Sequence, residues 1–313
     1  MRILVYGAGV VGSLYGGRLA GAGHEVTLLA RGRRLAELRE HGVLLEEART
    51  GARTEVRLPI VERLRPEDPW DLVVVAVPRQ AAPEVLPALA ASAAQSVLFL
   101  VTTADSPQPW IEAVGGERFL AGIPGAGGER RGPVVRYGIA PALILPTVLG
   151  EPGPRVGPRL RQVAAAFRKA GFPVAARGDI ADWLRTNAAI MTPLAQAIHA
   201  AGGDLGLLAR SGPLLDLLVG SVRENIAALE MDGVRIRPLH VASLGHAPAP
   251  LLRALVRRAL DSPHARDAMA PHALASRGEV QALAADLRVV AEACWLLAES
   301  GEQLEEAAGA TER

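Results

Sequence analysis

The sequence predicts an α/β fold with a doubly wound parallel sheet, followed by a second domain that is all-α. Two observations predict the sheet. Short β-rich runs alternate with amphipathic helical segments, and the runs at 72–77 and 97–101 are apolar at almost every position. Strands that are buried on both faces, as in a parallel sheet covered by helices, have this composition. The strand signals stop after about residue 178, and this predicts the helical domain.

The elements of the first domain follow one another in βα order. Strands are predicted at 2–6, 25–30, 54–60, 72–77, 96–101 and 172–176. Helices are predicted at 10–22, 33–41, 80–93 and 157–170. A glycine-dense stretch at 122–137 is interpreted as a loop, either one that approaches a binding cleft or a simple turn.

In the second domain, proline and glycine residues separate the predicted helices. These helices lie at about 179–201, 212–232, 250–260 and 273–300. We therefore expect two domains, 1–177 and 178–313. The acidic end of the chain, 302–313, has a single large apolar residue, Leu304, and is expected to fray.

The composition favours a cytoplasmic protein with no nucleic-acid or membrane partner; the small-molecule substrate that we expect rests on the motifs below. The formal net charge is +1, so no overall field attracts nucleic acid or an anionic membrane. The single cysteine, Cys294, cannot form an internal disulfide, and the first residues lack the apolar core of a signal peptide. No run approaches the ~18 apolar residues of a membrane span. We expect no metal site, and the apolar helices of the second domain allow a homodimer.

A glycine motif follows the first predicted strand and opens a helix, and a second strand comes after that helix. Gly7, Gly9 and Gly12 form G-x-G-x-x-G, the pattern of a Rossmann-type dinucleotide site. Gly7 permits the tight turn, Gly9 lets the backbone approach a pyrophosphate, and Gly12 lets the helix lie close to the sheet. The predicted cofactor-binding residues of this loop are Gly7, Ala8, Gly9, Val10, Val11 and Gly12. The alternative is a glycine-rich turn without a ligand.

The residue after the second strand selects the cofactor. Dinucleotide sites that prefer NAD carry an acidic residue there, but this chain has Arg31, followed by Arg33 and Arg34. An arginine suits a 2′-phosphate because it can donate two parallel hydrogen bonds. We therefore predict NADP(H), with Arg31 and Arg34 as contacts, and the alternative is a solvated basic loop.

Two loops after later strands are candidates to line the nicotinamide end. Ligands of a doubly wound sheet lie beyond the carboxyl ends of the strands. The stretch "AVPRQ" places Val77 and Pro78 there, and "VTTADSP" places Thr103 there. The alternative for each loop is a plain turn.

The order of these stretches resembles the ketopantoate reductase family. The resemblance covers most of the chain and is carried by "ILVYGAGVVGSLYGGRLAGAGHEVTLLARG", "VVVAVPRQ", "LRTNAAIMTPLAQAI" and "ASRGEVQAL". It implies a cleft between the two domains, in which NADPH delivers hydride to the keto carbon of a 2-keto acid. In the family, a lysine on the first helix of the second domain protonates the developing alkoxide, and a late glutamate with several asparagines or a serine holds the substrate.

The lysine of that pattern is missing from this chain. Counting back from Pro193, its position falls on Leu184. The neighbouring Arg185 is a poor proton donor because its pKa is too high. The only lysine of the chain, Lys169, lies in the preceding helix. The resemblance therefore leaves the proton donor unassigned.

Most other substrate positions of the family also differ, whereas the late glutamate is retained as Glu279. The asparagine positions correspond to Ala188, Thr192 and Thr103, and the serine position corresponds to Asp267. The lysine position after the 72–77 strand corresponds to Pro78.

The candidates for catalytic roles are Glu279, Thr192, Asn187 and His272, and Glu279 is also a candidate cofactor contact. His272 precedes Glu279 by seven residues, about two helical turns, so the two share a face if the helix begins that early. A histidine can act as an acid near neutral pH, and a capping or surface role is the alternative for His272. His199 is expected to be structural.

The function predicted from the sequence is the NADPH-dependent reduction of a small carbonyl compound of the 2-keto acid type. Leu184 at the lysine position leaves two alternatives open. One is a protein that binds NADP(H) without turnover, as a sensor or scaffold. The other is an enzyme that uses the same cleft for non-redox chemistry.

Overall fold

The computed structural model describes residues 1–143, 145–296 and 298–311, and it divides the chain into two compact units. Unit 1 contains Met1–Val101 and Pro107–Ile180, and unit 2 contains Thr102–Ser106 and Ala181–Arg313. The division near residue 180 lies close to the predicted one. The short segment Thr102–Ser106, which the sequence placed with the first domain, belongs to unit 2 by its contacts.

Unit 1 is built on a large sheet whose strand order is β12-β11-β8-β7-β6-β1-β2-β5. Its strands are β1 (Arg2–Tyr6), β2 (Glu25–Leu29), β5 (Ile60–Val61), β6 (Leu72–Val75), β7 (Val97–Phe99), β8 (Phe119–Ile123), β11 (Thr147–Gly150) and β12 (Val174–Arg177). All neighbours pair in parallel except β8 and β11. β1 pairs with β2 on one side and with β6 on the other, so the strand order reverses at β1, as in doubly wound sheets.

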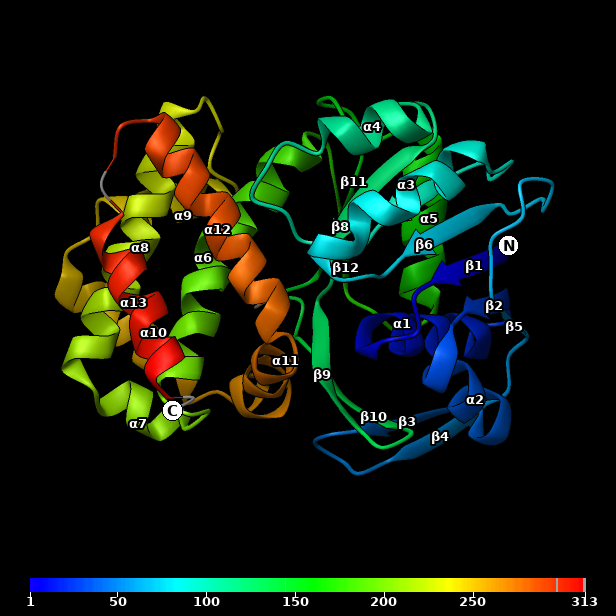
Figure 1. Cartoon of the computed structure of the whole chain (residues 1–313), viewed down its shortest axis with the longest axis horizontal. Helices are drawn as coiled ribbons and strands as arrows, with labels where there is room; N and C mark the ends of the chain where they lie inside the picture. Colours follow the sequence, from blue (N-terminus) through cyan, green and yellow to red (C-terminus); the bar gives the residue numbers. More distant parts are fainter. Residues whose placement is uncertain (144, 297, 312–313) are drawn as a thin grey trace. The chain divides into compact units, whose positions relative to one another are not determined.

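Helices cover both faces of this sheet (Figure 1). They are α1 (Val10–Gly21), α2 (Gly32–His41), the short 3-10 helix η1 (Arg79–Ala81), α3 (Ala82–Ala91), α4 (Gln108–Val114) and α5 (Pro158–Lys169). α1 contacts α5 on one face, and α3 contacts α4 on the other. The central strands β6 and β7 are buried along their whole length, which confirms the interpretation of their apolar runs.

A smaller sheet, which the sequence did not predict, packs against α1. Its order is β4-β3-β10-β9, with β3 (Val43–Glu47), β4 (Arg53–Val56), β9 (Ala126–Arg131) and β10 (Val134–Ile139). The predicted strand at 54–60 is wrong as one element, because its two ends belong to different sheets. The predicted loop at 122–137 is wrong as well, because most of it forms the hairpin β9–β10. A Cβ at Gly128 would lie 2.8 Å from the Cα of Tyr137, so glycine is needed inside the strand pair.

Two consecutive glycines let α1 lie between the two sheets. A Cβ at Gly16 would lie 3.0 Å from the side chain of Leu28 in the large sheet. A Cβ at Gly17 would lie 3.0 Å from the side chain of Leu45 in the small sheet. The helix therefore packs closely on both sides, and this fixes the loop that precedes it.

The described part of unit 2 contains helices and no strands. They are α6 (Ile180–Ala200, which begins at the last residue of unit 1), α7 (Leu205–Arg210), α8 (Gly212–Met231), α9 (Leu239–Ala242), η2 (Ser243–Gly245), α10 (Ala249–Leu260), the π-helical turn η3 (Ala265–Met269), α11 (Ala270–Ala275), α12 (Arg277–Ala293) and α13 (Glu299–Ala310). No helix in the described ranges is both long and apolar enough to cross a membrane.

Two expectations about the end of the chain are wrong. The predicted helix at 273–300 is divided, because the helical backbone is interrupted at Ser276 and again after α12. The acidic end does not fray before Ala310, because it forms α13. Leu304 of α13 is fully buried, and Glu224 accepts hydrogen bonds from the backbone N–H groups of Ser300 (3.0 Å) and Gly301 (3.1 Å).

Candidate functional site

The three motif glycines each have a structural reason. Gly7 has a φ of +109°, and a Cβ there would collide with the carbonyl oxygen of Ala76. A Cβ at Gly12 would collide with the carbonyl oxygen of Gly7 and lie 3.3 Å from Val5 of the sheet. At Gly9 no described atom lies within 4 Å of a Cβ position, so that side of the loop is open. The loop thus leaves space at the one position where a pyrophosphate is expected to approach.

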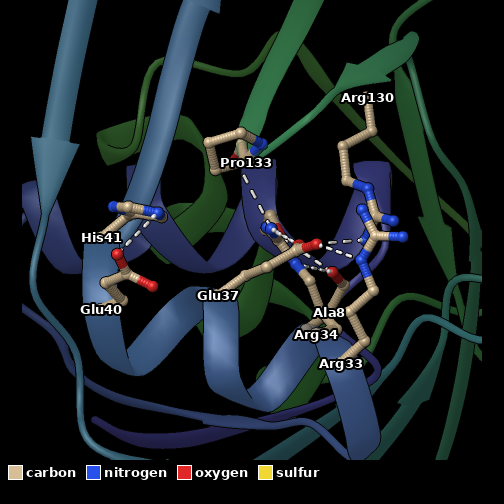
Figure 2. Close-up of polar contacts among 9 residues, drawn as sticks. Ala8, Arg33, Arg34, Glu37, Glu40, His41, Arg130 and Pro133 are labelled. Atoms are coloured by element: carbon tan, nitrogen blue, oxygen red, sulfur yellow. Dashed lines mark hydrogen bonds and ion pairs between the residues drawn. The ribbon is translucent and has the colours of Figure 1, made fainter.

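Arg34 holds the glycine loop in shape. Its Nε donates to the carbonyl oxygen of Ala8 (3.0 Å), and its Nη2 donates to Oγ of Ser13 (3.1 Å). Its Nη1 donates to Glu37 (3.2 Å) and to the carbonyl oxygen of Pro133 (3.4 Å), as Figure 2 shows in part. The arginine predicted to contact the cofactor therefore has a positioning role, and its direct contact with a cofactor stays a prediction.

Arg31 follows β2 and is exposed, as the cofactor prediction requires. Its Nε donates to the carbonyl oxygen of Glu62 and its Nη2 to the hydroxyl of Tyr6, both at 3.1 Å. These bonds anchor the guanidinium beside the carboxyl end of β1.

Glu37, in the middle of α2, lies among arginine side chains from α2 and from β9 (Figure 2). Its Oε1 accepts from Arg33 at 2.9 Å, and its Oε2 lies 3.2 Å from Nη1 of Arg34 and 3.8 Å from Nη1 of Arg130. Partial burial raises the pKa of Glu37, but the hydrogen bonds from Arg34 and Arg33 and the charge of Arg130 outweigh it, so its pKa lies below the usual value. The carboxylate is therefore ionised at neutral pH.

The structure brings Val77 to the glycine loop. Its Cγ1 lies 3.2 Å from the position of a Cβ on Gly7, because β1 and β6 are neighbours and end together. Pro78 follows and precedes the short helix η1.

Thr103 is buried and belongs to unit 2, as Glu279 does, whereas the other predicted cofactor residues belong to unit 1. Its Oγ1 accepts from the backbone N–H of Asp105 (3.2 Å). The next residue, Ala104, is held by α6, because Nε of Arg185 donates to its carbonyl oxygen at 2.6 Å. The same guanidinium donates to Asp232 at 2.7 Å. Sequence reasoning missed this contact, since it examined Arg185 only as a proton donor.

The family's polar row on α6 is largely apolar here. Leu184 and Ala188 are fully buried. Thr192, one turn after Ala188, is buried, and its Oγ1 has no hydrogen-bond partner among the described residues. Asn187 is half-buried on the same helix.

His272 and Glu279 lie on different helices, so the expectation that one helix presents both on a face is wrong. His272 lies in α11 and Glu279 in the first turn of α12. Ser276 separates them, and its Oγ donates to the carbonyl oxygen of His272 at 2.7 Å, which ends α11. His199 is buried, and its Nε2 bonds the carbonyl oxygen of Ala273 (2.8 Å), so it links α6 to α11.

The strand order and the loop after β1 define a dinucleotide-binding fold in unit 1. Residues 3–138 match the family described as ketopantoate reductase PanE/ApbA. This part of the chain is therefore similar to the ketopantoate reductase family, in agreement with the resemblance.

Solved structures share the fold of the whole chain. The 2-dehydropantoate 2-reductase of Geobacter metallireducens GS-15 has a TM-score of 0.75 at 19% identity and covers 99% of each chain. A D-mandelate dehydrogenase, solved with NADH and anilino(oxo)acetate, has a TM-score of 0.77 at 16% identity and covers 100% of this chain and 98% of its own. These likenesses confirm the predicted fold class.

A curated relative matches only a short part of the chain. The 2-dehydropantoate 2-reductase of Pyrococcus horikoshii is 46% identical over 46 residues, which is 15% of this chain and 15% of that protein.

Proposed function

We propose that the protein is a reductase of the 2-keto acid type that uses a nicotinamide cofactor, with NADPH preferred over NADH. The glycine loop is the observation that carries this proposal, because it is open at Gly9 and closed by backbone at Gly7 and Gly12. The family domain and the names of the structural neighbours support the same reaction class. The preference for NADPH rests on Arg31, which is exposed where an NAD site carries an acid.

The chain's own groups suit the binding of such a cofactor. The first turn of α1, beside Gly9, has N–H groups without intrahelical partners, and no side chain caps it in the described structure. A helix N-terminus of this kind suits a pyrophosphate through hydrogen bonds and the helix dipole. When bound, the reduced nicotinamide supplies a hydride to the keto carbon of the substrate. The negative charge that develops on the keto oxygen then requires a proton or a hydrogen-bond donor from the protein.

Thr192 is the group of unit 2 that we assign to the substrate. A buried hydroxyl without a partner destabilises the folded state by about 1–3 kcal/mol, so its position favours contact with a ligand. We assign Asn187 to the same contact surface of α6. His272 and Glu279 stay the candidates for proton donation and substrate binding, from α11 and α12.

One observation favours the second candidate function, a protein that binds NADP(H) without redox turnover. Leu184 is fully buried and apolar at the position of the family's lysine. Arg185 is committed to Ala104 and Asp232, so it does not replace that lysine. A cofactor loop that is retained while the lysine position is apolar is what we expect of a sensor.

Two measurements test the proposal. NADPH and NADH are titrated by cofactor fluorescence, and NADPH consumption is then followed with ketopantoate, benzoylformate and other 2-keto acids. Binding with turnover of at least one keto acid supports the reductase, whereas binding without any turnover supports the sensor. Failure to bind either cofactor contradicts both.

The cofactor preference has its own test. Arg31→Asp should weaken NADPH binding about tenfold or more and leave NADH binding within about twofold. Arg57→Asp, an exposed arginine paired with Glu55, is the matched control and should change neither. An unchanged preference in Arg31→Asp contradicts the assignment of NADPH.

A further inference from the structure

The arginines around Glu37 differ in how firmly the protein holds them. Arg34 is fixed by Ala8, Ser13 and Pro133 in addition to Glu37. The guanidinium groups of Arg33 and Arg130 each have Glu37 as their only polar partner in the described part of the chain. If Glu37 turned away, Arg34 would stay in place, whereas Arg33 and Arg130 would be released.

The charge of this cluster is not balanced by its own residues. Three guanidinium groups approach one carboxylate, which leaves an excess of two positive charges among these four described residues. Glu37 uses both of its oxygens, Oε1 toward Arg33 and Oε2 toward Arg34 and Arg130. A phosphate monoester carries nearly two negative charges and three acceptor oxygens, so it matches this excess better than a carboxylate does.

The cluster also lies where an adenosine ribose is expected. α2 begins directly after β2, and the ribose of a dinucleotide binds at the end of that strand. Arg34 connects the cluster to Ala8 of the glycine loop. At Gly32, the first residue of α2, no described atom lies within 4 Å of a Cβ position, so the space above the helix start is open.

We propose that Glu37 is an internal counter-ion that holds Arg33 and Arg130 in the free protein and yields them to the 2′-phosphate of the cofactor. Arg130 comes from the hairpin β9–β10, so a strand remote in sequence contributes to cofactor specificity (Figure 2). This inference rests on the proposed function. The exchange replaces a carboxylate by a phosphate as partner of the two arginines and forms or breaks no covalent bond.

Adenosine 2′-monophosphate tests the exchange separately from catalysis, with adenosine 5′-monophosphate as the comparison. Both are titrated into the full-length protein by calorimetry. Arg130→Gln should weaken binding of the 2′-phosphate about tenfold, because a charge-assisted contact is lost, and should leave the 5′-phosphate unaffected. Glu37→Gln should strengthen binding of the 2′-phosphate about fivefold, because the competing carboxylate is removed.

Two matched controls lie on the same hairpin. Arg131→Gln and Glu129→Gln make the same charge changes in a pair that does not involve Glu37, and neither should alter binding of the 2′-phosphate. Equal or weaker binding in Glu37→Gln at unchanged thermal stability would overturn the counter-ion role. No effect of Arg130→Gln would overturn the role of the hairpin. A protein that lacks reductase activity but shows these shifts would contradict the proposed function alone.

Discussion

The glycine loop of unit 1 and helix α6 of unit 2 differ in what they retain from the family pattern. In the loop, backbone atoms occupy the space beside Gly7 and Gly12, so any side chain there is excluded. On α6, Leu184 and Ala188 are buried and apolar at positions that the resemblance assigns to a lysine and an asparagine, and the helix is intact. A site made by the backbone is constrained by the fold itself. A site made by side chains can be replaced without loss of structure.

The largest effect is expected from substitutions in the loop. Gly12→Ala should lower the free energy of unfolding by about 3 kcal/mol and abolish cofactor binding, because the added methyl group collides with the carbonyl of Gly7. Gly9→Ala is the matched variant: it should change stability by less than about 0.5 kcal/mol and still weaken cofactor binding. Urea unfolding and NADPH titration measure both. Equal destabilisation by the two variants would contradict the distinction between a packed and an open glycine.

Arg185→Met is expected to have the second largest effect. It leaves the buried carbonyl of Ala104 without its donor and Asp232 without its cation, so stability should fall by about 2–3 kcal/mol. Arg235→Met removes an exposed ion pair with Asp182 on the same helix and should lower stability by less than about 1 kcal/mol. If both variants behave alike in urea unfolding, α6 does not hold the segment Thr102–Ser106 as described.

A pair of threonines on α6 separates ligand binding from stability. Thr192→Val removes a hydroxyl that has no partner in the described structure, so stability should stay unchanged or rise by up to about 1 kcal/mol while KM for the substrate rises. Thr186→Val removes a hydroxyl that bonds the carbonyl of Asp182 and the N–H of Arg237, so it should lower stability by about 1–2 kcal/mol. An unchanged KM in Thr192→Val would remove Thr192 from the proposed substrate contacts.

The smallest effect concerns pH. Burial lowers the pKa of His199, although its bond to Ala273 opposes this shift, and the charge of Arg277 adds to it. The unfolded chain therefore binds the proton more readily, and the stability that neutral His199 contributes is present above about pH 6.5 and is lost as pH falls toward the lower, folded pKa. Urea midpoints at neutral pH and about pH 5 should differ less in His199→Gln than in the unsubstituted protein. An equal difference would contradict this source of acid sensitivity.

The centre of the large sheet could be predicted because β6 and β7 are buried on both faces and their sequences are apolar runs, whereas β8 and β11 were not predicted. The small sheet could not, because β3, β4 and β9 carry charged residues instead of apolar runs, and β9 begins with Ala126, Gly127 and Gly128, a composition typical of loops. The separation of His272 from Glu279 depends on one non-helical residue, Ser276, which has no distinct sequence signal.

The site residues also divide into those that could be predicted from the sequence and those that could not. The roles of Gly7 and Gly12 could be predicted, because a position without space for a Cβ requires glycine, and glycine is visible in the sequence. Arg34 illustrates what could not be predicted, since its partners Ala8, Ser13 and Pro133 come from separate parts of the chain. The contribution of Arg130 was hidden for the same reason, as it depends on a hairpin that the sequence did not reveal.

The parallel pairing of β3 with β10 has a consequence for the order of folding. Val134 of β10 lies opposite Leu44 of β3, so the small sheet closes a loop of about ninety residues. During synthesis, β3 and β4 emerge long before β10. Until β10 pairs with β3, they form at most an isolated hairpin, which is only marginally stable by itself. We therefore expect the cluster of Glu37 and Arg130 to assemble only after β10 has been synthesised, so that the cofactor preference depends on a long-range pairing that forms more slowly than the local contacts of the first strands.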